Sequence, residues 1–379
     1  MRVQIVDPSA FTPPYDHALS AALARAGADV ELITSRFAYG SVAAPDGYVL
    51  REHFYRHARG AAGSRVRSLT KLGEHVPDML RYRTRARGAD IVHFQWLDVQ
   101  WLDRLLLPRR PLVLTAHDLL PREPRPGQVG AQRRLYDAVD ALVVHSQYGR
   151  EQLVRELGLD PRKVHVVHHG AFEHLTRTPS MPLASELEQV AGPVVLFFGL
   201  LRPYKGVDVL LEAWRDAPAG AELWIVGRPR MDIAPLRAAA PPGVRFISRY
   251  VPDAELASYF WRADVVVLPY SHTERFDQSG VLATALAFAK PVVLSDVGGF
   301  GEVAATGAGV LVEAGDVASL SGALSRLLGD EAERSRLAQA AREAAAGSYS
   351  WDEAARRTLD VYRGLAGMRD GAAPQSAPT

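Results

Sequence analysis

Short apolar runs alternate with helical patterns along almost the whole chain, and this alternation restricts the folds that it can adopt. In the first half the runs are Val3–Val6, Asp29–Thr34, Ile91–Phe94, Leu112–Thr115, Ala141–Val144 and Val164–Val167. A second series starts afresh with Val194–Phe198, Leu223–Val226, Val244–Ile247, Val265–Leu268, Pro291–Ser295 and Gly309–Val312. Such alternation is typical of βαβ units with buried parallel strands. The sequence therefore predicts two Rossmann-like, doubly wound α/β domains in tandem.

The length of 379 residues agrees with two domains, because a single hydrophobic core stops growing at about 250–300 residues. We assign residues 1–172 to the first domain and residues 192–350 to the second. Residues 173–191 contain Pro179 and Pro182 and lack a sustained pattern, which predicts a linker. The Pro-, Ala- and Ser-rich residues 370–379 are predicted to be disordered.

The composition excludes several classes of protein and site. The chain contains no cysteine, which excludes disulfides, thiolate zinc sites and cysteine nucleophiles. The amino terminus has one Arg before an apolar run that Asp7 and Pro8 interrupt, unlike a signal peptide. No run approaches the ~18 uninterrupted apolar residues of a membrane span. We therefore expect a cytoplasmic protein, either free or peripheral on the inner face of the membrane.

Basic residues are concentrated in the first half of the chain. The stretch Arg51–Arg87 holds ten Lys and Arg residues, against the acidic residues Glu52, Glu74 and Asp78. Such a stretch either faces anionic lipid or a phosphorylated acceptor, or is a solvated Arg-rich surface. Nucleic-acid binding is a poor fit, because the basic excess is confined to this half and no nucleic-acid-binding module is recognisable.

A candidate diphosphate site follows the first predicted strand of the second domain. Ligands of open α/β sheets bind beyond the carboxyl ends of the strands. The turn after Val194–Phe198 contains Gly199 and the two cations Arg202 and Lys205, and a helix follows it. Charge-assisted hydrogen bonds from such cations suit a diphosphate, although a turn of this kind also occurs without a ligand.

Two later segments of the second domain carry further candidates. The residues Gln278, Ser279, Gly280 and Val281 stand where a helix begins, and free amides at that position favour a phosphate. A plain helix cap is the alternative interpretation. The glycine-rich segment Ser295–Glu302, after the next strand, forms either a ligand loop or a tight turn.

Histidines are the candidate catalytic groups of the first domain. His117 follows Leu112–Thr115 and His93 lies in Ile91–Phe94, so both stand near the carboxyl edge of the sheet, as catalytic groups or as satisfied polar residues. The adjacent His168 and His169 point to opposite faces of a strand, so we do not expect them to bind one metal together.

Taken in order, several stretches resemble glycosyltransferase family 4, whose fold is GT-B. In the second half these stretches are FFGLLRPYKGVDVLLEAW, ELWIVGRP, ADVVVLPY and KPVVLSDVGGFGEV. In the first half they are LVLTAHD and VVHSQYGREQL. The resemblance implies two Rossmann-like domains that face each other across a cleft, with a closing helix, about 352–368, that crosses back onto the first. It also implies retaining transfer from a nucleotide-diphosphate sugar to an acceptor hydroxyl, without a metal ion or another cofactor.

The resemblance also implies roles for particular residues. Lys205, with Arg202, grips the diphosphate, and His117 lies beside the transferred sugar. Around the donor it places Gly199, Gln278, Ser279, Gly280, Val281 and Thr284, with the backbone of Arg249, Tyr250 and Val251 at the base. On the acceptor or sugar side we expect Tyr15, Asp16, His93 and Ser146. The resemblance does not identify the acceptor, which is a saccharide, a lipid-linked sugar or a small molecule.

The chain departs from the family pattern at three points. Leu200 stands where the family has Arg, and Arg202 is the substitute. The two glutamates of the family fall at Phe276 and Thr284, so Glu274 is the nearby carboxylate. We expect Glu274 to replace the first glutamate or to act as a nucleophile. Pro13-Pro14-Tyr15-Asp16 occupies the position of the amino-terminal glycine pair.

Other functions fit the same domains. A sugar-nucleotide epimerase or a glycoside phosphorylase also uses paired domains of this kind. The altered glutamate pair keeps a non-catalytic sugar-nucleotide-binding protein as a third possibility.

Overall fold

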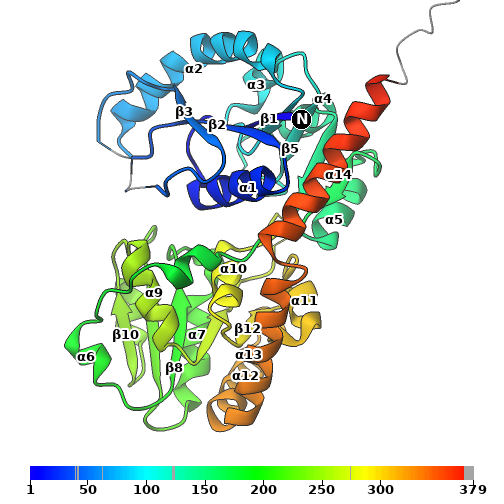
Figure 1. Cartoon of the computed structure of the whole chain (residues 1–379). Helices are drawn as coiled ribbons and strands as arrows, with labels where there is room; N and C mark the ends of the chain where they lie inside the picture. The colour runs from blue at the N-terminus through cyan, green and yellow to red at the C-terminus, as the bar shows by residue number, and fades with distance from the viewer. Residues whose placement is uncertain (39, 41, 62, 122–123, 274, 371–379) are drawn as a thin grey trace, which may run out of the picture. The chain divides into compact units, whose positions relative to one another are not determined.

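The computed structural model describes residues 1–370 except 39, 41, 62, 122, 123 and 274, with the backbone alone for residues 368–370. The chain divides into two compact units (Figure 1). The first comprises Met1–His168 and Trp351–Thr379, and the second comprises His169–Ser350. The first unit is therefore discontinuous, because the end of the chain returns to it.

The described residues of the first unit form a parallel seven-stranded sheet with strand order β3-β2-β1-β4-β5-β6-β7. The strands are β1 (Arg2–Asp7), β2 (Asp29–Ser35), β3 (Val49–Phe54), β4 (Ile91–Phe94), β5 (Leu112–Thr115), β6 (Ala141–Val144) and β7 (Val164–Val166). The helices are α1 (Pro13–Arg25), α2 (Arg65–Arg85), α3 (Gln100–Leu106), α4 (Gln128–Ala138), α5 (Gln147–Leu157) and α14 (Trp351–Asp370), with a 3-10 turn at Ala86–Gly88. Strand order reverses between β1 and β4, which is where such sheets bind ligands.

The two faces of this sheet have different covers, since successive strand side chains point to opposite sides. On one face Val6, Val92 and Phe94 join the hydrophobic core formed with α2, α3, α4 and α5. The other face, with Ile5 and His93, is covered by α1 and α14, which contact each other (Figure 1).

The described residues of the second unit form a parallel six-stranded sheet with strand order β10-β9-β8-β11-β12-β13. The strands are β8 (Val194–Phe198), β9 (Glu222–Val226), β10 (Val244–Ile247), β11 (Val265–Leu268), β12 (Val292–Ser295) and β13 (Gly309–Val312). The α-helices are α6 (Ser185–Glu188), α7 (Val207–Ala213), α8 (Ala234–Ala239), α9 (Asp253–Arg262), α10 (Gly280–Ala287), α11 (Phe300–Val303), α12 (Val317–Gly329) and α13 (Glu331–Ala346). Shorter turns are η2 (Glu173–Arg177), η3 (Pro203–Lys205), η4 (Trp214–Asp216) and η5 (Ala304–Ala308). This is the strand order of a Rossmann fold, with its reversal between β8 and β11.

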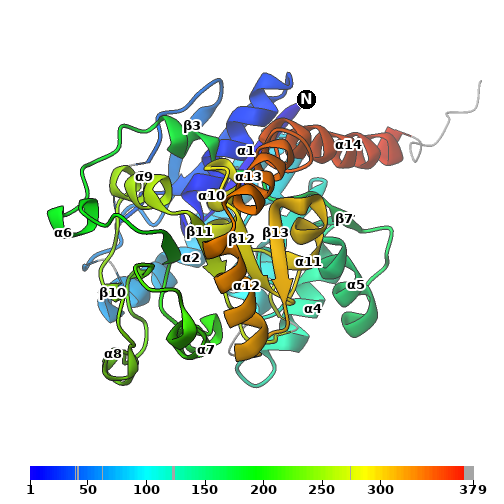
Figure 2. The same cartoon turned by 90° about the horizontal axis from the view of Figure 1, so that it is seen from below.

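Helices cover both faces of the second sheet. Phe197 and Ile225 pack in a core with residues of α7 and α12, which contact each other (Figure 2). On the opposite face the Trp224 ring meets Tyr259 of α9 edge-on. The doubly wound α/β architecture predicted from the apolar runs is confirmed in both units.

Two segments differ from the expectation. Residues 173–191 belong to the second unit rather than forming a separate linker, because η2 packs against α9 and α10 and buries Leu175. The basic stretch contains a strand and a helix, β3 and α2, that were not predicted. β3 is a half-exposed edge strand, so its sequence lacks the continuous apolar run of a buried strand. Residues 371–379 lie outside the described part of the chain.

Candidate functional site

Lys205 lies at the point where strand order reverses in the second sheet. It ends η3, which follows β8, and its side chain is buried at 7% exposure. Its Nζ donates a hydrogen bond to the Tyr270 hydroxyl at 2.8 Å, just beyond the carboxyl end of β11. The structure therefore holds the ammonium group between the ends of the two central strands.

The amino terminus of α10 continues this cluster. The Ser279 hydroxyl lies 3.2 Å from the Tyr270 hydroxyl and caps α10 by accepting from the Val281 amide at 3.3 Å. The Gln278 Oε1 accepts from the Ser279 amide at 3.0 Å. The Gln278 Nε2 is buried and has no hydrogen-bond partner within the described residues, so a donor is left at the start of α10. This end of the helix adds amide dipoles to the cation of Lys205.

Three glycines allow the strand ends to approach closely. A Cβ on Gly199, which has φ +116°, would lie 3.1 Å from the Lys205 Nζ and 3.3 Å from Val281 Cγ2. A Cβ on Gly227 would lie 1.8 Å from the Gly199 carbonyl oxygen, and one on Gly206 would lie 1.9 Å from that of Pro269. Gly199 therefore belongs to the wall beside Lys205 and α10.

The two positions that lack the family glutamates have other tasks. Phe276 is buried between Tyr270 and Phe300, with ring centroids 5.5 and 5.1 Å away, and so helps to fix Tyr270. The Thr284 hydroxyl donates to the Gly280 carbonyl at 2.8 Å, so its hydrogen is already used within α10. Glu274 lies outside the described residues.

The remaining donor-side candidates, apart from Val251, are more exposed. Arg202 is half-buried, and its side chain makes no hydrogen bond or ion pair within the described part of the chain. The Arg249 guanidinium forms a two-pronged ion pair with Glu255, with NH1 2.8 Å from Oε2. Tyr250 is half exposed and Val251 is buried. The side chain of Arg249 is thus engaged by Glu255.

In the first unit His117 stands among aromatic rings at the carboxyl end of β5. The Trp96 ring stacks on it at 5.0 Å and 14°, and Tyr15 meets it edge-on at 4.6 Å. Its Nε2 lies 3.2 Å from Gln95 Oε1, and its Nδ1 lies 3.2 Å from His145 Nε2. Tyr15 and His117, predicted separately as site residues, are therefore in contact.

Asp16 is buried in a carboxyl pair with Asp7. Asp7 accepts hydrogen bonds from the amides of Ser9, Phe11 and Thr12, so it shapes the loop after β1. Burial, with a hydrogen bond and repulsion between the two carboxyls, raises the pKa of Asp16 well above its usual value. Burial likewise raises the pKa of Asp7 to about 6. Asp16, in the first turn of α1, is therefore paired with Asp7 inside the unit.

His93 and Ser146, predicted on the acceptor or sugar side, also make internal contacts. The His93 ring is fully buried, with Nδ1 2.7 Å from the Tyr362 hydroxyl and Nε2 2.8 Å from Thr115 Oγ1. Burial lowers the pKa of His93 to about 3, so the ring is neutral. Ser146 caps α5 by accepting from the Gly149 amide at 2.9 Å. Both residues support the fold, His93 from within β4 and Ser146 at the start of α5.

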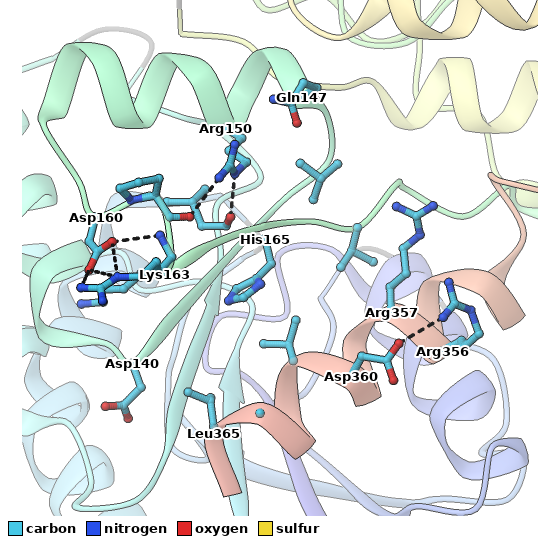
Figure 3. A pocket seen from close by; sticks show the side chains of 17 residues that line it. Asp140, Gln147, Arg150, Asp160, Lys163, His165, Arg356, Arg357, Asp360 and Leu365 are labelled. Atoms are coloured by element: carbon cyan, nitrogen blue, oxygen red, sulfur yellow. Dashed lines mark hydrogen bonds and ion pairs between the residues drawn. The ribbon is translucent and has the colours of Figure 1, made fainter. Parts of the chain in front are cut away.

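A cavity of about 890 Å³ lies along the outer edge of β7, lined by α5 and α14 (Figure 3). Its cations have protein partners: Arg162 pairs with Asp160, Arg356 with Asp360, and Arg150 donates to two backbone carbonyls. It lies along the side of the sheet and does not include the cluster around His117, so we do not assign the acceptor to it.

Several residues of these clusters were not predicted. Tyr270 stands in the ADVVVLPY stretch, and Gln95 and Trp96 directly follow β4. Their positions just beyond strand ends were a usable signal, because ligands gather there. His145 directly follows β6 in the same way.

Comparisons with known proteins agree with this geometry. The family model described as "Glycosyltransferase Family 4" matches residues 15–171, and that of "Glycosyl transferases group 1" matches residues 192–330. This chain is a member of glycosyltransferase family 4. The glycosyltransferase is 36% identical to the D-inositol 3-phosphate glycosyltransferase of Xylanimonas cellulosilytica, over 72% of this chain and 71% of that protein. It is 30% identical to the protein of the same name from Kineococcus radiotolerans, over 95% and 91% of the two chains.

Solved structures confirm the fold of the glycosyltransferase. Sucrose-phosphate synthase from Thermosynechococcus elongatus matches with a TM-score of 0.74 at 20% identity, over 97% of this chain and 100% of that one. HepE of Anabaena, in complex with UDP and glucose, matches with a TM-score of 0.72 at 17% identity, over 96% and 100%. The fold is thus GT-B, as expected. None of the described helices combines the length and apolar character needed to cross a membrane.

Proposed function

We propose that this glycosyltransferase moves a sugar from a nucleoside-diphosphate sugar, held by the second unit, to a hydroxyl of a phosphorylated acceptor. The observation that carries the proposal is the buried ammonium of Lys205, beside Gly199 and the amino terminus of α10. A diphosphate leaving group gains negative charge during transfer, and fixed cations and amides stabilise it. The UDP complexes of the similar HepE support a nucleoside diphosphate as the ligand.

The finer mechanism is part of the proposal. Lys205 and Arg202 supply the positive charge, so transfer proceeds without a metal ion. The sugar keeps its anomeric configuration, because the acceptor hydroxyl attacks from the face that the diphosphate leaves, and the diphosphate takes its proton. A double displacement through Glu274 is the alternative, and a Glu274→Gln variant that keeps most of its activity excludes it.

The phosphorylated acceptor rests on two observations. The curated relatives are named for transfer to D-inositol 3-phosphate. The first unit also carries the basic stretch Arg51–Arg87. A phosphorylated polyol is therefore the acceptor class that we put first.

A panel of donors and acceptors tests the function. Thermal unfolding is measured with UDP-glucose, UDP-N-acetylglucosamine and GDP-mannose, and the stabilising donor is incubated with inositol phosphates, sugar phosphates and their unphosphorylated forms. We expect mass spectrometry to detect a glycosylated phosphate ester, proton NMR to show retention, and EDTA to leave the rate unchanged. Conversion of the donor without an acceptor indicates an epimerase, and glycoside cleavage by inorganic phosphate indicates a phosphorylase. Binding without any turnover indicates a non-catalytic protein.

A second proposal concerns the membrane. α2 exposes Val66, Leu69, Leu72 and Leu80 at helical spacing, and Arg65 and Arg83 lie on the same side of the helix. An exposed apolar row with flanking arginines suits the surface of an anionic bilayer. We expect the protein to float with phosphatidylglycerol vesicles at low salt, and Leu69→Gln with Leu72→Gln to abolish this. Equal recovery with neutral vesicles, or no flotation, contradicts peripheral binding.

A further inference from the structure

A chain of hydrogen bonds leads from the backbone beyond β7 to His117. The Val167 amide donates to the Val144 carbonyl at 2.9 Å, which extends the ladder between β6 and β7 and fixes the next carbonyl. The carbonyl of Val167 lies 3.0 Å from His145 Nδ1. A carbonyl oxygen only accepts hydrogen bonds, so His145 carries a proton on Nδ1.

The proton position on His145 determines the one on His117. In a neutral His145 with Nδ1 protonated, Nε2 is an acceptor. His117 Nδ1 lies 3.2 Å from that Nε2, so it is the donor of this hydrogen bond. A neutral His117 therefore has its proton on Nδ1 and its lone pair on Nε2.

The Gln95 amide completes the chain at the other end. Its Oε1 lies 3.2 Å from His117 Nε2, and its Nε2 is buried without a hydrogen-bond partner in the described residues. Turning the amide by 180° makes Nε2 the donor to His117 and puts the acceptor Oε1, instead of a donor, at the position without a partner. Every hydrogen bond then points the same way, from Gln95 through His117 and His145 to Val167.

We propose that His145 is a positioning residue that holds His117 in the Nδ1-protonated tautomer. The ring plane of His117 is set separately, by stacking on Trp96 and edge contact with Tyr15. His145 thus decides which nitrogen accepts hydrogen bonds, while the aromatic residues decide where it points. The inference rests on the proposed function only in its kinetic consequence, that a hydroxyl of the bound sugar replaces the Gln95 amide as the hydrogen-bond donor to His117 Nε2.

The tautomer is measured on the full-length protein by long-range proton–nitrogen NMR of the imidazole rings, with His117→Gln to assign the signals. We expect neutral His117 and His145, both protonated on Nδ1. His145→Gln places an amide oxygen near the position of the lost Nε2 and should keep the His117 tautomer. His145→Phe removes the acceptor and should move His117 toward the Nε2-protonated form. An Nε2-protonated His117 in the unaltered protein, or the same tautomer in all three proteins, overturns the proposal.

Turnover gives the second measurement. With the donor and acceptor found by the panel above, we expect His145→Phe to lower kcat roughly 10-fold, the equivalent of one hydrogen bond, with an unchanged donor KM. His145→Gln should stay close to the original rate. A wild-type protein without transferase activity contradicts the proposed function and leaves the NMR result to judge the tautomer alone. Thermal unfolding of both variants checks that they fold.

Discussion

The ammonium of Lys205 and the hydroxyl of Tyr270 lie 2.8 Å apart, although 65 residues separate them in the sequence. The contact joins the turn after β8 to the turn after β11, across the reversal in strand order. The rings of Phe276 and Phe300 pack against the Tyr270 ring. The donor site that we propose is thus braced by aromatic packing, where the family uses a glutamate at the position of Phe276.

Loss of the cations should impair turnover. We expect Lys205→Ala and Arg202→Ala each to lower kcat on the order of 10²–10³-fold, because each removes a charge that stabilises the leaving diphosphate. Tyr270→Phe keeps the ring but removes the hydroxyl that Lys205 contacts, and it should lower kcat about 10-fold. Lys163→Ala, at a lysine bonded to the Asp137 carbonyl in the first unit, is the control. Near-normal turnover of both variants would contradict the assignment of Lys205 and Arg202 as the groups that bind the diphosphate.

Gly199→Ala should damage the donor site beyond its effect on the backbone. The new Cβ would lie 3.1 Å from Lys205 Nζ and would displace the ammonium. Gly220→Ala is the matched control, because Gly220 also has a positive φ, of +85°, with nothing within 4 Å of its Cβ. We expect both variants to lose about 1–3 kcal/mol of stability. Only Gly199→Ala should weaken nucleoside-diphosphate binding in calorimetry; equal affinities would remove Gly199 from the site.

The carboxyl pair of Asp7 and Asp16 should make stability fall as the pH rises. The pKa of Asp7 is raised from 3.8 to about 6 in the folded protein, so the folded chain binds this proton more tightly than the unfolded chain. The contribution of Asp7 to the free energy of unfolding therefore decreases between about pH 4 and pH 6, by roughly 3 kcal/mol.

Urea unfolding of the Asp16→Asn variant tests whether stability falls as the pH rises. The amide can still donate to Asp7 and carries no charge, so the variant should be more stable than the original protein at pH 8. The difference should shrink at pH 5, because this lies below the pKa of Asp7, about 6, and the carboxyl pair then carries less negative charge. If the stability difference between the variant and the original protein grows on acidification, the raised pKa of the carboxyl pair is contradicted.

Tyr362→Phe should destabilise the first unit by about 1–3 kcal/mol, because it leaves His93 Nδ1 buried without its partner. Tyr250→Phe, at a residue 51% exposed, is the control and should change stability by less than about 0.5 kcal/mol. Both are measured by urea unfolding. An equal effect of the two substitutions would show that the hydrogen bond to His93 contributes nothing.

Local sequence patterns were enough to predict the two sheets, but they could not predict which residues individual side chains contact. Buried strands such as β8 and β11 are continuous apolar runs, so the two parallel sheets could be predicted. β3 was missed because an edge strand exposes polar side chains. His93 was expected on the acceptor or sugar side from its place on a strand, whereas its partner, Tyr362, is 269 residues away. No local pattern signals such a contact, and the same holds for Lys205 with Tyr270.

The division of the first unit between the two ends of the chain has a consequence for biosynthesis. Domains tend to fold as units while the chain emerges from the ribosome. Residues 169–350 form a continuous segment, so the second unit has its complete sheet before residue 351 is made. Until α14 follows, Tyr15 lacks its contact with Trp351, and His93 lacks the hydroxyl of Tyr362. The half synthesised first is therefore the last to be finished. In a nascent chain arrested before α14, α1 alone among the described helices covers that face of the first sheet.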